Sequence, residues 1–285
     1  MSSVKLSPAI KRLLATRNPN SFPGPSRAPL TSVLQRTRAD ARKRGAEDGW
    51  LVLAACALLT SNVPPAFAHL YKVATHPQDA PKPADLATRV RTAALLREAA
   101  LKSTIFVGVP RVILSLAAFH GALEDDVHPE LRKEAHPDRH PSEDLTARGQ
   151  ALWQNIYAPH DVKLAAKLGS YHPDFIAFII QAYGAVLSPL PPTTSNTQGN
   201  LSRALGSVVG ISCLRAEARV GPQLVSHVFG LLKAGTWPGE LSAEDKWLGS
   251  DEGTQWVIET TDEILDVVEK DKESVEWEED VKAKL

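Results

Sequence analysis

Two histidines in similar local sequences are the strongest candidates for chemistry. His69 ends the segment Pro64-Pro-Ala-Phe-Ala-His69, and His227 ends Pro222-Gln-Leu-Val-Ser-His227. Imidazole exchanges a proton near neutral pH, so either side chain could act as a general acid or base. For His69, which has apolar neighbours, a hydrogen-bonded core histidine is the favoured interpretation. For His227 the catalytic and the structural interpretations both stay open.

Other polar side chains could assist such a histidine. A carboxylate could orient the imidazole, cations could hold an anionic substrate, and a phenol could donate a hydrogen bond. The candidates are Glu98, Lys102, Arg111, Tyr183 and Arg203. Glu98 and Lys102 are four residues apart, in the order that stabilises a helix surface, and this structural interpretation is favoured for them. The spacing does not determine whether these side chains converge.

The segment from residue 124 to residue 141 contains three more histidines. His128, His136 and His140, with Asp125, Asp126 and Asp138 nearby, are of the types that ligate zinc. Each of the three histidines is followed by proline, which keeps the preceding residue out of the helical region. His136 and His140 therefore cannot share a helix face, and we predict a charged linker, with no metal site and no cofactor.

The two cysteines lie in apolar segments. Cys56 and Cys213 are the only ones in the chain, and in such surroundings cysteine most often packs as a small buried hydrophobe. A secreted domain held by disulfides is therefore not expected.

The elements that position these residues are predicted to be helices. Apolar residues recur at spacings of three and four, as in Leu86, Val90, Ala93, Ala94 and Leu101. Prolines stand where new helices would begin, since proline suits the first turn of a helix and breaks its interior; they are Pro64, Pro65, Pro110, Pro173 and Pro222. We predict an all-α fold of about ten or more helices without a meaningful sheet.

Part of the sequence is repeated. When residues 53–73 are aligned with residues 210–231, with one insertion at Gly221, four kinds of residue coincide. The pairs are Cys56 with Cys213, Pro64 with Pro222, His69 with His227, and Tyr71 with Phe229. The repeat predicts two related helix-turn-helix units.

The second copy resembles a known family. Gly221-Pro-Gln-Leu-Val-Ser-His227, followed by Gly230 and Gly235, is similar to a helix start in the carboxymuconolactone decarboxylase family, which includes AhpD-like proteins. Residues 149–184 resemble the part before that family's core, and Arg203 matches its helix-opening arginine. In the first half, residues 50–71 show the same plan, and residues 96–102 and 108–111 are similar to the family's closing helices. The resemblance implies an AhpD-like helical fold with two tandem modules.

The resulting organisation has five parts. We expect a basic helical extension at 1–45, a first module at 46–123, the charged linker at 124–141, a second module at 142–270, and an acidic tail at 271–285.

Departures from the family pattern limit the chemistry. Val220 and Gln223 stand where peroxidase members have a Cys-x-x-Cys pair, and no acid lies between residues 203 and 208, where that branch has its glutamate. A thiol peroxidase is therefore not expected. The resemblance leaves a cofactorless acid/base enzyme acting on a small carboxylic acid, lactone or acyl derivative. Its candidate catalytic residues are His227, His69, Glu98, Lys102, Tyr183 and Arg203. The alternative is a catalytically silent binding or assembly protein. Members of the family commonly form homo-oligomers, so the resemblance also implies a homo-oligomer.

Charge and the chain ends indicate location. The net charge of −1 gives no basic footprint for nucleic acid, and the longest apolar run, residues 51–59, is far shorter than the roughly 20 residues of a membrane span. The last residues, Ala283-Lys284-Leu285, are a variant of the Ser-Lys-Leu signal bound by the peroxisomal import receptor. Polar residues 276–280 are expected to keep this tail outside the core. Residues 1–39 contain no acid, which leaves the mitochondrion as the alternative location.

Overall fold

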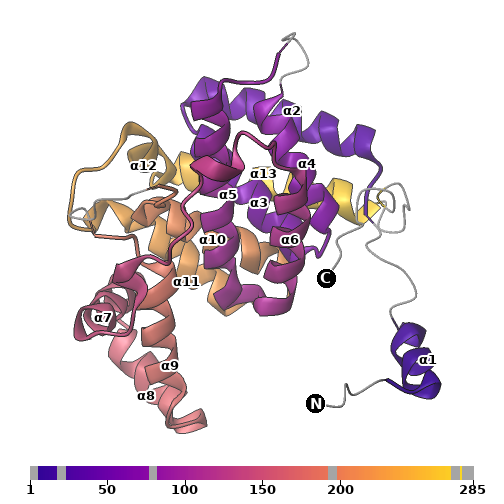
Figure 1. Ribbon diagram of the computed structural model, residues 1–285. Coiled ribbons are helices and arrows are strands. Elements are labelled where there is room, and N and C mark those ends of the chain that lie inside the picture. Colours follow the sequence, from indigo (N-terminus) through magenta and orange to yellow (C-terminus); the bar gives the residue numbers. More distant parts are fainter. Residues whose placement is uncertain (1–5, 18–23, 77–81, 192–197, 271–276, 278–285) are drawn as a thin grey trace.

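The computed structural model describes residues 6–17, 24–76, 82–191, 198–270 and 277, and this part of the chain contains thirteen α-helices and no strand (Figure 1). The prediction of an all-α fold is confirmed. The helices are α1 (Pro8–Arg17), α2 (Arg27–Arg44), α3 (Glu47–Thr60), α4 (Pro64–Thr75), α5 (Leu86–Val107), α6 (Val109–Ala122), α7 (Glu143–Tyr157), α8 (Asp161–Tyr171), α9 (Phe175–Ala182), α10 (Arg203–Glu217), α11 (Gly221–Leu232), α12 (Ala243–Leu248) and α13 (Asp251–Lys270). A π-helical turn, η3 (Tyr183–Leu187), continues α9.

Helix α3 lies at the centre of the fold. All of its residues from Gly49 to Thr60 are buried, and it packs against α2, α4, α5, α6, α10 and α13. An apolar sequence on every side of a helix requires such surroundings, because no face can be left in water. Two acids in its first turn, Glu47 and Asp48, stabilise the helix because their negative charges lie at the positive end of its dipole.

Prolines mark several helix starts, as expected. Pro64, Pro110 and Pro222 lie in the first turns of α4, α6 and α11. Helix α9 begins two residues after Pro173. A missing N–H costs nothing at these positions, since the first amides of a helix have no partner within the helix.

The repeated segments form two helix pairs, α3–α4 and α10–α11. Helices α3 and α10 lie against each other, and one hydrophobic core runs from Leu30 of α2 to Trp277. The division into two tandem modules stays a prediction, because the core is shared between the two halves of the chain.

A smaller second core joins α7, α9 and η3. Its buried residues are Leu152, Trp153, Ile156, Ile180, Tyr183 and Leu187. Two glycines allow the backbones to touch: a Cβ at Gly149 would lie 2.0 Å from the Ile180 carbonyl oxygen, and one at Gly184 would lie 2.0 Å from that of Leu145. Figure 1 shows this part, with α8, projecting from the main body.

Two segments outside the predicted modules pack into the core, and for the tail this corrects the expectation. Helix α2 is part of the core, because Leu30, Val33, Leu34 and Ala41 are at most 1% exposed. Trp277 of the acidic tail is also buried, and its Nε1 donates to the Pro25 carbonyl oxygen at 2.7 Å. The polar character of its neighbours failed to predict this, because one indole has enough apolar area to anchor a segment. The targeting residues 283–285 lie outside the described residues.

Candidate functional site

His227 lies inside the fold, in an aromatic environment. Its side chain is buried, with the Phe106 ring 5.2 Å and the Tyr157 ring 6.4 Å from the imidazole centre, both edge to face. Among the described residues its Nδ1 has no hydrogen-bond partner. Burial, with a smaller effect of the Arg203 charge, lowers its pKa to about 3. The imidazole is therefore neutral at physiological pH.

Glycine makes room for this ring. A Cβ at Gly210 of α10 would lie 2.6 Å from His227 Nδ1, closer than van der Waals contact allows. Helices α10 and α11 therefore approach each other closely at the histidine, and a larger residue at 210 would displace it.

Arg203 joins three helices beside that histidine. Its Nε donates to Asn155 Oδ1 at 2.9 Å, Nη1 to Ser207 Oγ at 2.6 Å, and Nη2 to the Gly230 carbonyl oxygen at 3.0 Å. The side chain is 4% exposed, and burial lowers its pKa to about 10, which leaves it charged at pH 7. No Asp or Glu within the described ranges forms an ion pair with it. All three of its nitrogen atoms are occupied by the protein itself.

Tyr183 completes the group of predicted residues that come together. Its hydroxyl lies 2.9 Å from that of Tyr157, and burial raises the pKa of both phenols. Tyr183 and Arg203 are near enough for each to affect the pKa of the other. Three of the six predicted catalytic residues, His227, Tyr183 and Arg203, therefore lie in one region, around a neutral imidazole.

This group is poorly suited to proton transfer. A general base works best with a pKa near the working pH and with access to its substrate. His227 has neither property, and no carboxylate among the described side chains orients its ring. The arrangement instead fastens α7, α10, α11 and η3 to one another.

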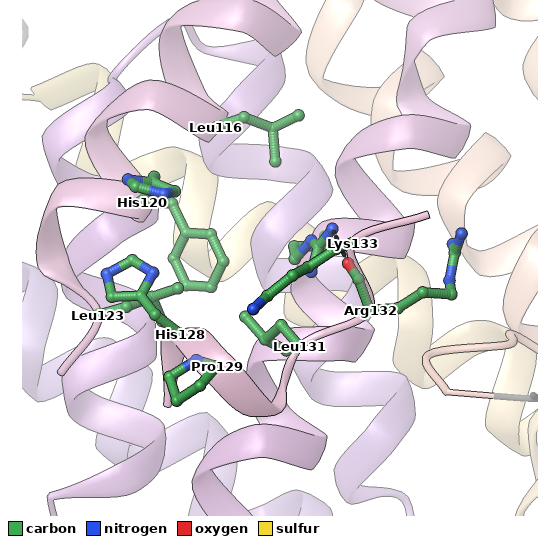
Figure 2. Close-up of a pocket in the computed structure, with 10 residues that line it drawn as sticks. Leu116, His120, Leu123, His128, Pro129, Leu131, Arg132 and Lys133 are labelled. Carbon is green, nitrogen blue, oxygen red and sulfur yellow. Dashed lines mark hydrogen bonds between the residues drawn. The ribbon is translucent and has the colours of Figure 1, made fainter. Parts of the chain in front are cut away.

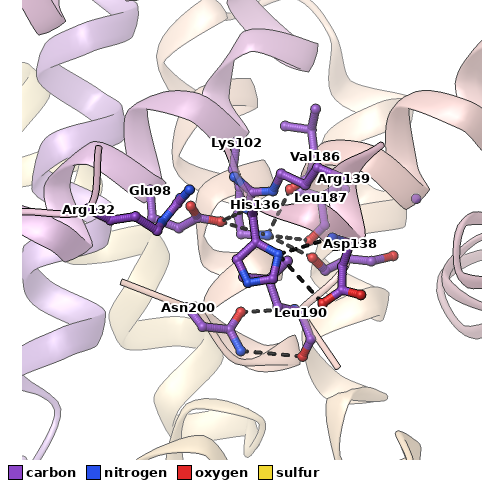
Figure 3. Close-up of polar contacts among 12 residues, drawn as sticks. Glu98, Lys102, Arg132, His136, Asp138, Arg139, Val186, Leu187, Leu190 and Asn200 are labelled. Atoms are coloured by element: carbon purple, nitrogen blue, oxygen red, sulfur yellow. Dashed lines mark hydrogen bonds and ion pairs between the residues drawn. The ribbon is translucent and has the colours of Figure 1, made fainter. Parts of the chain in front are cut away.

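Glu98 and Lys102 form a separate buried cluster, so the interpretation of a surface pair was wrong. Lys102 is fully buried and Glu98 is 5% exposed, with Lys102 Nζ 3.5 Å from Glu98 Oε1. The ammonium donates to the carbonyl oxygens of Val186, Leu187 and Ser188 at 2.8–2.9 Å (Figure 3). It thereby satisfies the carbonyl groups at the end of η3, where the helix leaves them without partners.

The segment 124–141 supplies the second cation for this cluster. Arg139 donates to Glu98, and Figure 3 shows both beside His136, which is 2% exposed. Burial lowers the pKa of Lys102 to about 8, whereas Lys102 and Arg139 together outweigh burial and lower the pKa of Glu98. The predicted charged linker is thus packed against α5 and forms part of the buried structure.

Two histidines of this segment lie on either side of a short turn. His136 and His140 have extended backbones on either side of a short 3₁₀ turn, as expected before proline. The described residues contain no group of three or more His, Cys, Asp or Glu side chains that could hold a metal ion.

His69 and Arg111 lie elsewhere and have structural contacts. His69 Nε2 is 2.8 Å from Thr31 Oγ1, and the imidazole meets the Trp277 ring edge to face at 5.6 Å. Arg111 donates to the Thr60 carbonyl oxygen and to Glu217, both at 2.8 Å, and so links α6 to α3 and α10. The hydrogen bond expected for His69 is present, but the side chain is half-buried and not enclosed as predicted for a core histidine.

The two cysteines meet at the centre of the core. Cys56 and Cys213 are buried, and each sulfur lies 3.4 Å from the Ser103 hydroxyl oxygen. The thiols come from equivalent positions of α3 and α10, which reflects the sequence repeat.

A pocket of about 740 Å³ lies between α5, α6 and residues 128–133 (Figure 2). It is lined by Arg97, Leu116, Phe119, His120, Leu123, His128, Pro129, Leu131, Arg132 and Lys133. These residues include three cations and no carboxylate. Figure 2 shows His120 and His128 at one side and Lys133 reaching in from the other.

Sequence reasoning missed this pocket. None of its polar residues except His128 was considered for function, because basic residues near a proline-rich segment are typical of solvated surface. The only available signal was the closeness of Arg132 and Lys133 to an apolar residue, Leu131.

Comparisons with protein-family models, with curated proteins and with solved structures find no match. In the described part of the chain, no helix is both long enough and apolar enough to cross a membrane. The structure therefore supports the all-α class, and the family resemblance stays a prediction.

Proposed function

We propose that this chain is a binding protein with a carboxymuconolactone-decarboxylase-like fold, in which His227 has a structural role and does not transfer protons. One observation carries the proposal: the leading catalytic candidate is buried, 2% exposed, with a pKa of about 3. A side chain that is almost fully buried and stays neutral is poorly suited to act as acid or base at neutral pH.

The remaining predicted catalytic residues support the same conclusion. Arg203 and Lys102 donate to internal oxygen atoms, and Glu98 is paired with two cations. Buried charges held in this way stabilise one arrangement of helices. The pocket beside α6, by contrast, offers space and three cations that form no ion pair with the described residues.

Thermal unfolding of the purified protein with a panel of small acids, lactones and acyl-CoA esters tests this function. A ligand at a hundred times its dissociation constant stabilises the native state by about 2.7 kcal/mol, which is visible as a shift of the midpoint. We expect at least one acid to shift wild type and His227→Phe equally. Exchange of solvent deuterium into that ligand, followed by NMR, should show no turnover.

The opposite result is equally clear. A shift that is present in wild type and absent in His227→Phe, accompanied by deuterium exchange, would establish an acid/base enzyme. No shift with any member of the panel would contradict a small-molecule binding protein.

We also propose that the protein associates with further copies of itself through α8 and α9. Helix α8 has no buried residue, and large apolar side chains on this projecting pair are exposed: Val162 75%, Tyr171 66%, Phe175 42% and Phe178 63%. Apolar clusters of this kind mark interfaces on soluble proteins. Light scattering should give the molar mass of a dimer or a larger assembly, and Phe178→Glu should lower this mass. A monomeric wild type at high concentration would exclude self-association.

For location, we propose import into the peroxisome through Ala283-Lys284-Leu285. A fluorescent fusion with these residues at its free carboxyl end should give a punctate distribution, which removal of the three residues should abolish. Unchanged puncta would refute the signal, and a mitochondrial pattern would support the basic amino-terminal region instead.

A further inference from the structure

We propose that the pocket between α5, α6 and residues 128–133 binds an organic oxyanion with an apolar body, such as a medium-chain carboxylate. This inference rests on the proposed binding function and names its ligand class. The site differs from the region of His227, and it is built from residues of the first half and of the segment that follows it.

The charge of the pocket is one-sided. Arg97, Arg132 and Lys133 line it without a carboxylate, and none of the three forms an ion pair with a residue in the described ranges. Burial and the nearby charge of Arg132 lower the pKa of Arg97 by more than the neighbouring Glu98 raises it, so the two guanidinium groups repel each other. An anion bound in the pocket among these three cations would relieve this repulsion.

The floor of the pocket is apolar. Phe119, Leu123 and Leu131 are at most 8% exposed, and the partly buried Leu116 lies beside them. An alkyl body would cover the apolar surface that Leu116 and its neighbours still expose to the pocket, which a ligand consisting only of a charged group would leave in water. A volume of about 740 Å³ is in the range of small-molecule sites and accepts a chain of several carbon atoms.

The wall that carries Lys133 is held in place before any ligand arrives. Gln198 Oε1 accepts from the Arg132 amide at 2.8 Å, and its Nε2 donates to the Glu130 carbonyl oxygen at 2.9 Å. Arg97 Nη2 donates to the Arg132 carbonyl oxygen at 3.1 Å. A wall fixed by these contacts needs little ordering on binding, which favours affinity.

Two imidazoles form the opposite wall. The His120 and His128 rings are 4.5 Å apart, and Figure 2 shows them facing the pocket across from Lys133. Each imidazole can donate an N–H to an anion, so the two rings suit the same ligand.

A series of octyl compounds tests the head group at constant chain length. Isothermal titration calorimetry on the full chain should show binding of octanoate, weaker binding at high salt, and at least tenfold weaker binding of octanol and octylamine. Octyl phosphate is included to distinguish a carboxylate from an oxyanion site in general. Equal binding of octanol and octanoate, or no binding of either anion, would overturn the proposal.

Lys133→Gln is the decisive variant, because Lys133 is exposed and its loss leaves the fold intact. Its matched control is Lys167→Gln, which removes the same charge from an exposed position on α8. We expect a loss of about tenfold in octanoate affinity for Lys133→Gln and none for the control, as for one lost charge-assisted hydrogen bond. Equal affinities of the two variants would refute the site.

Arg97 gives an independent check. Arg97→Lys keeps the charge, and Arg97→Gln removes it while keeping a donor for the Arg132 carbonyl group. Binding should be retained better in Arg97→Lys, at an unchanged unfolding midpoint of the free protein. If a different ligand from the panel stabilises wild type and Lys133→Gln equally, the binding function stands and this pocket assignment fails.

Discussion

The two helix pairs α3–α4 and α10–α11 carry the same motif in different surroundings. His69 is partly exposed and bonded to Thr31, whereas His227 is buried between aromatic rings with an unpartnered Nδ1. In the register of the repeat, Leu53 occupies the place of Gly210, and Ala46 that of Arg203. A repeated sequence thus gives a repeated helix pair, and the neighbouring helices decide what each histidine can do.

The largest effect should come from Arg203, the charge that only the second pair has. Arg203→Met should lower the free energy of unfolding by about 3 kcal/mol, because Asn155, Ser207 and the Gly230 carbonyl group lose charged donors in the interior. Denaturant unfolding measures this. Arg36→Met, which breaks an exposed pair with Glu263, is the control and should change stability by less than about 1 kcal/mol.

Gly210→Ala tests the close packing around His227, which the first helix pair does not share. The new methyl group would meet His227, so we expect a destabilisation of about 2 kcal/mol. Combining it with His227→Ala should cost less than the sum of the two single variants, because the clash is removed. Gly169→Ala on α8, where nothing lies within 4 Å, should instead be neutral or slightly stabilising.

The pH dependence of stability should separate the two histidines. The pKa of His227 falls from 6.5 to about 3 on folding, so the unfolded state binds the extra proton. Above pH 6.5 the neutral imidazole does not lower the free energy of unfolding. As the pH falls from 6.5 toward 3, the free energy of unfolding decreases by up to about 1.4 kcal/mol per pH unit. Between pH 6.5 and 5, wild type should lose about 2 kcal/mol relative to His227→Phe.

A second, partly buried group, Glu244, also changes the stability in this pH range. Glu244 has its pKa raised from 4.5 to about 7, mainly by burial, and its effect on stability has the opposite sign over the same range. Subtracting the curve of His227→Phe from that of wild type removes this contribution. Parallel curves for the two proteins would show that His227 is not buried as described.

The smallest effect is expected at His69. Thr31→Val removes the hydroxyl that contacts Nε2 and should cost about 1 kcal/mol, the usual value of one hydrogen bond. Thr146→Val, at an exposed position, is the control. A loss as large as that of Arg203→Met would mean that the first pair also depends on its polar contact.

Local sequence predicted the helices well and the environment of their side chains poorly. The burial of α3 followed from its apolar residues on every side, and the hydrogen bond of His69 from its neighbours. Lys102 was assigned to a surface, because spacing along one helix contains no information on what covers it. Its partners, the carbonyl groups of residues 186–188, lie more than eighty positions away in the chain.

The sequence by itself determined the class of fold and the helix starts that prolines mark. These depend on periodicity and on the covalent geometry of proline, which act within a few residues. Only the tertiary structure decided that His227 is enclosed, that Glu98 and Lys102 fasten η3, and that segment 128–133 forms a basic pocket with α5 and α6. Burial and charge pairing are properties of neighbours brought together by folding, and they set the chemistry that each side chain can perform.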